Sequence, residues 1–283
     1  MQGDPLPSIS EADATGRVAD LYDDIRKTLG MSFVNLVWRH LASIPDGLEW
    51  TWATMKPLFA NGTVYSEADA LRAAPDLPPV PRFSTAALRA VGIDADQEMA
   101  IRATLSGYDR GNPLNTVAFC AVLARLNGST PSPCPPVRPP SRAPSALPVP
   151  PPLNFDQMPT HVAELVRSVN LIGARGQEQT LQVSLPRNLA RWPSMLVLYY
   201  AALQPLHDSG SLLTAVDCVV DDARRRGVTV SGALGRTGLP EPATTAAVRA
   251  SLEQLIPHAM GRMIPVVSLL LRMLPAGPQE KIR

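Results

Sequence analysis

The sequence predicts an all-α protein built from two related halves. Apolar residues recur along most of the chain at helical spacing, and no segment shows the alternation of a half-buried strand. Identical residues also recur at a shift of 148, more often than the about two matches expected from composition. The matched pairs include Arg39 and Arg187, Leu41 and Leu189, Ala42 and Ala190, Pro45 and Pro193, and Gly62 and Gly210.

A shift of 147 relates later segments, because Ala100, Arg102 and Leu105 fall on Ala247, Arg249 and Leu252. This period is longer than the roughly 20 to 50 residues of a solenoid repeat. We therefore expect a tandem-repeat, pseudo-dimeric helical protein with a quasi-twofold junction, where a pocket would take walls from both copies. The predicted organisation is a first helical repeat over residues 1–130, a Pro-rich linker over 131–152, and a second helical repeat over 153–283.

In the first half, two amphipathic helices come first. One apolar face is formed by Phe33, Leu36, Val37, His40, Leu41 and Ile44, and this helix must stop at Pro45. A second helix carries Leu48, Trp52, Met55 and Phe59. The cluster Pro75–Pro81 predicts a loop, and a further helix carries Ile101, Leu105 and Tyr108.

Gly111-Asn112-Pro113 predicts a break between that helix and the next one. A residue before proline is pushed out of the right-handed helical region, so Asn112 is expected at an interruption with its amide displayed. The second half has His258-Ala259-Met260 at these positions. The shared fold therefore does not require the break, and a functional role for Asn112 stands beside a simple turn.

Two segments, 115–126 and 263–274, are apolar almost all round and predict central buried helices. Between the halves, 11 of the 22 residues from Pro131 to Pro152 are proline. Such a segment excludes helix and favours an extended polyproline conformation, with a reach of roughly 68 Å at about 3.1 Å per residue. We interpret it as a semi-rigid strap that connects the two repeats.

Charge and composition exclude several partners. The formal net charge is +1 and no basic stripe is present, which argues against nucleic acid. The longest apolar stretch, Met263–Leu274, contains Pro265 and Arg272 and is too short to cross a bilayer of about 30 Å. The N-terminus is polar and acidic, unlike a signal peptide. We expect a cytoplasmic protein without a membrane partner.

The sequence contains no motif for metal, redox or phosphate chemistry. Cysteines at 120, 134 and 218 and histidines at 40, 161, 207 and 258 have neither disulfide nor metal-ligand spacing. Glycine-rich phosphate loops and a nucleophile-elbow serine are absent as well. We therefore expect no metal and no cofactor.

The sequence resembles the group I 2-haloacid dehalogenase family over nearly the whole chain. The segments that carry the resemblance are Leu21–Leu29, Gly111-Asn112-Pro113 and Leu189–Pro193. The resemblance implies a cytoplasmic, all-helical tandem-repeat protein that forms a homodimer. It implies a hydrolase that acts on both enantiomers of short 2-haloalkanoic acids, in which an aspartate activates water to displace halide directly.

The same resemblance assigns pocket residues. Asn112 matches the asparagine that holds the water or the substrate, and Phe33 and Leu36 match the aromatic residues near the start of the first repeat. Ser184 matches the serine that precedes the catalytic aspartate, but Leu185 stands where that aspartate is expected. General-base catalysis contributes roughly 10² to 10⁴ in rate, so this change should remove most dehalogenase activity.

A carboxylate elsewhere would have to replace the base, because no Asp or Glu lies between Gln179 and Leu206. Asp109, three residues before Asn112, is the first candidate, and its neighbour Arg110 could bind a substrate carboxylate bidentately. Asp217 is a second candidate for the base. A surface acid and base at a helix end is the alternative interpretation of Asp109 and Arg110.

Three functions stay open on the sequence alone. One is a dehalogenase-family hydrolase with a relocated base. Another is a divergent family member that catalyses a different reaction on a larger or more apolar molecule. The last is a non-catalytic binder of a small carboxylate or apolar metabolite. In each case the partner is a small molecule.

Overall fold

The computed structural model describes residues 6–139, 149–175 and 181–276. Secondary structure in these ranges is helical, which confirms the predicted all-α class. The first half contains α1 (Gly16–Leu29), α2 (Leu36–Leu41), α3 (Gly47–Asn61), α4 (Thr63–Ala73), α5 (Thr85–Ala90) and α6 (Ala95–Leu126).

The second half is helical as well. Its elements are η1 (Phe155–Gln157), α7 (Thr160–Leu171), α8 (Ser184–Leu189), α9 (Pro193–Asp208), α10 (Ser211–Val230), η3 (Ser231–Ala233), α11 (Pro242–Leu255), η4 (Ile256–Gly261) and α12 (Arg262–Met273). Helices begin at 36 and 184, at 63 and 211, and at 95 and 242. These starting positions differ by 148, 148 and 147 residues, which are the shifts that relate the two halves of the sequence. The tandem repeat itself stays a prediction that these offsets support.

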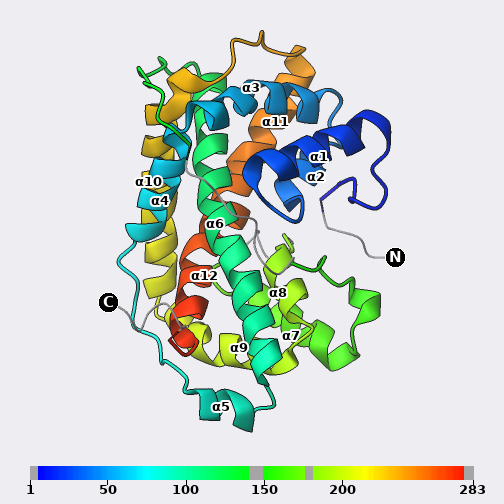
Figure 1. The fold of residues 1–283 in the computed structure, drawn as a ribbon, viewed down its shortest axis with the longest axis vertical. Coiled ribbons are helices and arrows are strands. Elements are labelled where there is room, and N and C mark those ends of the chain that lie inside the picture. Colours follow the sequence, from blue (N-terminus) through cyan, green and yellow to red (C-terminus); the bar gives the residue numbers. More distant parts are fainter. Residues whose placement is uncertain (1–5, 140–148, 176–180, 277–283) are drawn as a thin grey trace.

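Helix α6 runs through the middle of the molecule, with the other helices around it (Figure 1). Its start is fixed by a capping box in which Gln97 N donates to Asp94 Oδ1 at 2.8 Å and Asp94 N donates to Gln97 Oε1 at 3.0 Å. From Gly111 to Ala124 every residue of α6 is buried. This helix therefore forms the axis on which both ends of the molecule pack.

The predicted break at Gly111-Asn112-Pro113 is wrong, because α6 is one helix from Ala95 to Leu126 with Pro113 inside it. An internal proline lacks one helical hydrogen bond and costs about 3 kcal/mol or more. Burial of the surrounding helix on all sides outweighs that cost, since Leu114, Val117 and Ala118 are almost fully inaccessible to solvent. Asn112 thus projects from a continuous helix.

The second half is irregular at the matching place. Residues Ile256–Gly261 form the π-helix η4 between α11 and α12, with Pro257 near its start. Single π turns within α-helices are rare and are often found at functional sites. The two long helical runs, α6 and α11–η4–α12, are therefore both irregular near their middles, through an internal proline in one and a π turn in the other.

Two hydrophobic cores lie at opposite ends of α6. The first, which we call the α1–α4 core, contains Tyr22, Trp38 and Leu58 together with the C-terminal half of α6 and residues of α11 such as Leu252. The second, the α7–α9 core, contains Leu189 and other residues of α7–α9 together with the N-terminal half of α6 and much of α12. Each core takes residues from both sequence halves (Figure 1). The predicted domain boundaries stay a prediction.

The short helix α2 is shorter than its apolar pattern predicted. It spans Leu36–Leu41, whereas the predicted apolar face extended from Phe33 to Ile44. Asn35 is extended at its start, and the chain turns before Pro45 and continues through Asp46 at φ 55°. The predicted loop at Pro75–Pro81 is confirmed, because no helix forms between α4 and α5.

The Pro-rich strap forms no helix or strand where the structure describes it, at residues 131–139 and 149–152, and the rest of the strap lies outside the described residues. Its first part crosses the junction between α3 and α4. Asn61 Nδ2 donates to Cys134 O at 3.1 Å, and Val137 N donates to Asn61 O at 2.8 Å. Gly62 has φ 89° and leaves no room for a side chain against Val137. The start of the strap is therefore bound to the first half.

One helical stretch of the described chain, Pro242–Met273, is long and apolar enough to span a membrane. Of the most apolar 18 residues in this stretch, 67% are buried inside the protein. It packs against α6 and α10. The stretch is thus accounted for as the core helix of a globular fold.

Helices α6 and α10 approach each other closely at Gly227. A Cβ atom at this position would lie 2.6 Å from the carbonyl carbon of Cys120 and 2.8 Å from Ala121 N. Both neighbours are backbone atoms, which cannot move aside as a side chain can. The crossing of α6 and α10 therefore depends on a glycine at 227.

We expect Gly227→Ala to lower the free energy of unfolding by about 1 to 3 kcal/mol through overpacking, although alanine favours helix over glycine. Urea denaturation measures the change. Gly238→Ala is the matched control, because no atom lies within 4 Å of a Cβ there, and its effect should stay within about 0.5 kcal/mol. An unchanged midpoint for Gly227→Ala would show that the two helices can separate without cost.

Candidate functional site

A small, partly open cavity lies where the two cores meet. It is bounded by the starts of α2 and α8 and by the middles of α6 and the η4–α12 run, and its volume is about 40 Å³. Its walls are mostly apolar, with a few polar groups among them. The lining residues are Asn35, Leu36, Val37, Tyr108, Asn112, Val183, Ser184, Leu185, Ala259, Met260 and Met263.

The walls of the cavity come in pairs related by the sequence shifts. Residues 35–37 at the start of α2 correspond to residues 183–185 at the start of α8 under the shift of 148. Asn112 corresponds to Ala259 under the shift of 147. The cavity thus takes walls from both halves of the chain, and the quasi-twofold junction itself stays a prediction. The differences within each pair, such as Asn112 against Ala259, give the two sides different chemistry.

Most of the predicted pocket residues meet here. Asn112, Leu36, Ser184 and Leu185 all line this one cavity, although 149 positions separate the first and last of them in the sequence. Phe33 is not a lining residue, but its ring centroid lies 5.3 Å from that of Tyr108. Phe33 therefore supports the wall from behind. Their roles in catalysis or binding stay predictions.

The candidate replacement bases lie elsewhere. Arg72 Nη1 donates to Asp109 Oδ2 at 3.3 Å, between α4 and α6. Burial raises the pKa of Asp109, and the charge of Arg72 and hydrogen bonds from Arg72 and Ser268 lower it by less. Arg110 is exposed. Neither Asp109 nor Arg110 lines the cavity.

Asp217 is also remote from the cavity, because it lies at the surface on α10 and accepts a hydrogen bond from Arg175 Nη2 at 2.6 Å. Among the residues that the structure describes, the lining set therefore contains no carboxylate. The side chain at the position of the expected aspartate, Leu185, is fully buried and apolar.

Tyr108 is the site residue that the sequence analysis placed in the core instead. Its side chain and that of Asn112 are four residues apart on α6, so they lie on one face of the helix. That spacing would have been the signal for a shared site, had α6 been expected to be continuous. Met263 was expected only within a buried helix, and Met260 was noted only as the counterpart of Pro113 under the shift of 147.

Two polar atoms of the cavity have no protein partner. Asn112 Nδ2 is buried and forms no hydrogen bond within the described structure. The Tyr108 hydroxyl is also buried, and although it faces the Ser184 side chain, no protein atom meets hydrogen-bond geometry with it. A buried unsatisfied donor costs about 1 to 3 kcal/mol. Two such atoms beside one cavity indicate a polar ligand or ordered water.

Two arginines contribute positive charge near the Tyr108 hydroxyl, although burial has the larger effect on its pKa. Burial raises the pKa of Tyr108, while the Ser184 side chain and the positive charges of Arg39 and Arg187 lower it by less. Both arginines are buried, Arg39 on α2 and Arg187 on α8, and the shift of 148 relates them. Their charges act at low dielectric, where a bound anion experiences them more strongly than in water.

Buried asparagines hold both walls in place. Asn115 Nδ2 donates to Asn35 Oδ1 at 3.2 Å, and Trp38 Nε1 donates to Asn115 Oδ1 at 3.2 Å. On the other wall, Val183 N donates to Asn170 Oδ1 at 3.0 Å. Such supporting hydrogen bonds keep the lining residues in fixed positions. No group of three metal-ligating side chains occurs in the described parts of the chain.

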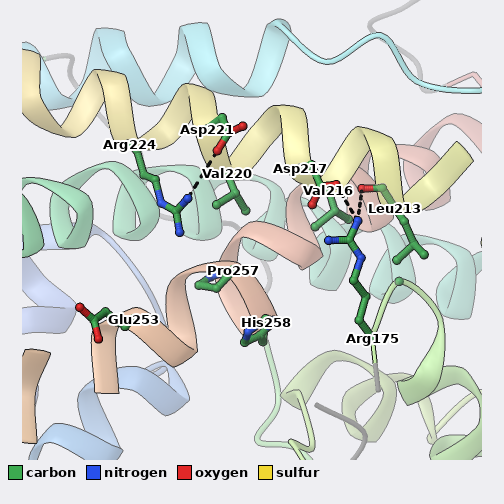
Figure 2. Close-up of a pocket in the computed structure, with 11 residues that line it drawn as sticks. Arg175, Leu213, Val216, Asp217, Val220, Asp221, Arg224, Glu253, Pro257 and His258 are labelled. Carbon is green, nitrogen blue, oxygen red and sulfur yellow. Dashed lines mark hydrogen bonds and ion pairs between the residues drawn. The ribbon is translucent and has the colours of Figure 1, made fainter. Parts of the chain in front are cut away.

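A larger groove lies on the surface between α10 and η4, with a volume of about 470 Å³ (Figure 2). Its arginines are already paired along α10: Arg175 with Asp217 at 2.6 Å, and Arg224 with Asp221 at 3.4 Å. All four of these side chains are at least half exposed, so the pairs contribute little stability. None of the buried, unpartnered polar atoms belongs to the groove. The small central cavity is therefore the better candidate site.

Comparison with known proteins identifies relatives. No known protein-family model matches the chain. It is 31% identical over 117 residues to a configuration-inverting 2-haloacid dehalogenase of Pseudomonas sp. strain 113, and 29% identical over 110 residues to one of Alcaligenes xylosoxydans xylosoxydans. The matches cover 41% and 38% of this chain. They span only 38% and 37% of the length of these two relatives.

The fold is similar over a much larger part of the chain. A D-2-haloacid dehalogenase mutant in complex with D-2-CPA matches with a TM-score of 0.79 at 17% identity, over 96% of this chain and 97% of that one. A D-2-haloacid dehalogenase in complex with L-LA matches with a TM-score of 0.76 at 18% identity and the same coverage. The chain is therefore a relative of the configuration-inverting 2-haloacid dehalogenases and has the all-helical fold of the D-2-haloacid dehalogenases.

Proposed function

We propose that the protein binds short 2-haloalkanoic acids in the central cavity and hydrolyses their carbon–halogen bond slowly. The observation that carries this proposal is the pair of unpartnered donors, Asn112 Nδ2 and the Tyr108 hydroxyl, beside a cavity with apolar walls. The relationship to 2-haloacid dehalogenases supports the same substrate class.

The carboxylate of such an acid matches the polar side of the cavity. Arg39 and Arg187 place positive charge near the Tyr108 hydroxyl, which can donate to a carboxylate oxygen. Hydrogen bonds to charged groups are worth about 1.5 to 3 kcal/mol each. We therefore assign the carboxylate to Tyr108 and Asn112.

The apolar walls of the cavity fit the rest of the substrate. A water molecule needs about 10 to 15 Å³ of such space, so a cavity of about 40 Å³ holds roughly three water-sized groups. Leu36, Leu185 and Met263 provide apolar contacts for a halogen and a short alkyl group. An acid of two or three carbons has more non-hydrogen atoms than this, so its binding requires the lining side chains to move apart, and a longer acid requires a larger movement.

The chemical step requires more than binding. A water oxygen attacks carbon 2, the carbon–halogen bond breaks with its electron pair going to halide, and the water loses a proton. Asn112 can orient that water through its amide, but an amide does not accept the proton. Because the lining set contains no carboxylate, the proton passes to solvent water. The step therefore lacks the roughly 10²- to 10⁴-fold acceleration that a general base supplies.

We expect Leu185→Asp to raise the rate of halide release by about 10² to 10⁴, because it places a carboxylate in the cavity wall. Halide release is measured from both enantiomers of 2-chloropropionate and 2-bromopropionate. Burial should raise the pKa of the new carboxyl group, so the gain should grow as pH rises through that pKa.

Leu185→Asn is the matched control, since its amide has the same shape and accepts no proton; it should stay at the rate of the unmodified protein. Halide release from neither the unmodified protein nor Leu185→Asp would contradict the hydrolase. Saturable binding of the acids without release would leave a carboxylate-binding protein.

We expect Tyr108→Phe to leave the free energy of unfolding unchanged or to raise it by about 1 kcal/mol, because it removes an unsatisfied buried hydroxyl. The same variant should bind 2-chloropropionate about tenfold more weakly, since it loses a donor to the carboxylate. Thermal denaturation and calorimetric titration measure the two effects.

Tyr22→Phe is the control, because the Tyr22 hydroxyl donates to Ile9 O at 2.9 Å and its loss should destabilise the protein without weakening binding. A clear loss of stability in Tyr108→Phe would show that its hydroxyl has a structural partner.

The proposal includes a cytoplasmic location and a homodimeric assembly. Cys120, Cys134 and Cys218 are all free thiols, which the reducing cytoplasm maintains, and this supports a cytoplasmic protein. The homodimer implied by the family resemblance stays a prediction that sedimentation analysis would check.

A further inference from the structure

We propose that Asn35 recognises the ligand of the central cavity, and that Trp38 and Asn115 fix its side-chain amide so that it offers N–H donors to a carboxylate. The kind of ligand rests on the proposed function. The orientation of the amide is tested below without any ligand.

The side chain of Asn35 does not serve the helix that it precedes. Asn35 is the residue before α2, where asparagine is favoured because its side-chain oxygen accepts a hydrogen bond from the first turn of the helix. The Asn35 side chain makes no such bond. Its Oδ1 instead accepts from Asn115 Nδ2 on α6 at 3.2 Å. The side chain is therefore turned from α2 towards α6, at the cavity that Asn35 lines.

The direction of these hydrogen bonds follows from Trp38, because an indole nitrogen can only donate. Trp38 Nε1 donates to Asn115 Oδ1 at 3.2 Å. The other end of the Asn115 amide is then its nitrogen, which donates to Asn35 Oδ1. In this Trp38–Asn115–Asn35 relay the oxygen of Asn35 is occupied. Its NH₂ group, with two donors, is left for a ligand.

The nitrogen of Asn35 is accessible. Within the described chain Asn35 Nδ2 has no hydrogen-bond partner, yet it is not among the fully buried unpartnered atoms, which include Asn112 Nδ2 and the Tyr108 hydroxyl. The Asn35 residue as a whole is 8% exposed, and the cavity that it lines is partly open. Asn35 thus adds a third donor to the two on α6.

The start of the relay is rigid. Trp38 and Asn115 are fully buried, and the Trp38 ring centroid lies 4.6 Å from that of Phe119 and 5.5 Å from that of Trp52. Turning the Asn115 amide over would set its NH₂ group against the Trp38 N–H, and two buried donors facing each other are costly. Neither Trp38 nor Asn115 lines the cavity. Both are therefore positioning residues that act through Asn35.

The second half of the chain has no equivalent relay. Under the shift of 148, Asn35 and Trp38 correspond to Val183 and Pro186 at the start of α8. The Val183 side chain is apolar, and Pro186 has neither an indole nor a backbone N–H. Helix α8 nevertheless forms. The relay is therefore not required for a helix at this place in the fold, which favours a role in the site.

We expect Asn35→Asp to bind 2-chloropropionate about 10- to 100-fold more weakly at neutral pH, because a donor to the carboxylate is replaced by a negative oxygen. The variant keeps an oxygen for Asn115 Nδ2. Calorimetric titration measures binding of the acid and of the neutral 2-chloropropionamide, whose own NH₂ group can donate to the new oxygen. The parent should prefer the acid, and the variant should prefer the amide.

Lowering the pH through the pKa of the new carboxyl group should restore part of the acid binding, because the protonated group donates an O–H. Asn127→Asp is the matched control, since it adds the same charge at the exposed end of α6 and should change neither affinity. Unchanged binding of the acid by Asn35→Asp would overturn the proposal. So would an equal loss for acid and amide, because that outcome reports a change of shape. Binding of neither compound by the parent would reject the proposed function and the role of Asn35 in recognition, but not its orientation.

The orientation is tested on the protein without ligand through Trp38→Phe, which removes the indole N–H and keeps an aromatic ring. Nuclear magnetic resonance measures hydrogen exchange of the side-chain amides. We expect the Asn115 NH₂ group to exchange about tenfold faster in this variant, because its amide is no longer held from the Trp38 side. The preference for the acid over 2-chloropropionamide should also fall.

Trp50→Phe is the control for loss of an indole, because Trp50 Nε1 donates to Gly238 O at 2.7 Å, outside the relay. It should leave exchange at Asn115 unchanged. The buried amide of Asn170, whose Nδ2 donates to Leu181 O at 3.0 Å, is the internal reference. Equal exchange at Asn115 in the parent and Trp38→Phe would overturn the relay. Parallel acceleration at Asn170 would also count against it, because the whole protein would then be opening.

Discussion

The packing of two long helical runs against each other is the constraint on which the rest of this structure depends. Helix α6 and the α11–η4–α12 run each pass from one hydrophobic core to the other, so neither core is complete without helices from both halves of the chain. Each run is irregular near its middle, at Pro113 in one and in the π turn of η4 in the other. Side chains pack less regularly at such places than along an ideal helix. The central cavity lies at this level of the molecule, between the two cores.

The central cavity contains buried polar groups that destabilise the protein when no ligand is bound. Tyr108 and Asn112 project from α6 with atoms that have no protein partner, although α6 is otherwise one of the best-packed elements. Leu36 and Leu185 on the opposing helices offer apolar contacts. A fold selected for stability alone would place apolar side chains at all of these positions, because unsatisfied buried donors are costly. Other buried polar atoms without a partner occur elsewhere in the described chain, such as the Tyr199 hydroxyl, but Tyr108 and Asn112 are the ones that line this cavity.

The helical class and the offsets of 148 and 147 could be predicted from the sequence, because periodicity and repetition are properties of the chain itself. The meeting of Asn112, Leu36, Ser184 and Leu185 was implied by the family resemblance instead. The sequence was insufficient at Gly111-Asn112-Pro113. The local rule that a proline breaks a helix is correct for an exposed segment, but burial on all sides kept α6 continuous. Because of that error, Tyr108 was not predicted as a site residue, although it shares a helix face with Asn112. Asp109 could not be placed from the sequence, since its partner Arg72 comes from α4 and only the packed structure brings them together.

Because the two halves supply different parts of the cavity, binding and chemistry can change separately. The unpartnered donors belong to the first half, on α6, whereas the position of the expected base belongs to the second, at the start of α8. A leucine in place of the expected aspartate at 185 leaves the donors and the nearby arginines in place, since an apolar side chain takes no part in hydrogen bonds or ion pairs. Losing a buried carboxylate also removes a desolvation cost, so stability would not oppose such a change. The geometry therefore separates two parts of the site: the unpartnered donors are present, whereas the described lining residues include no carboxylate.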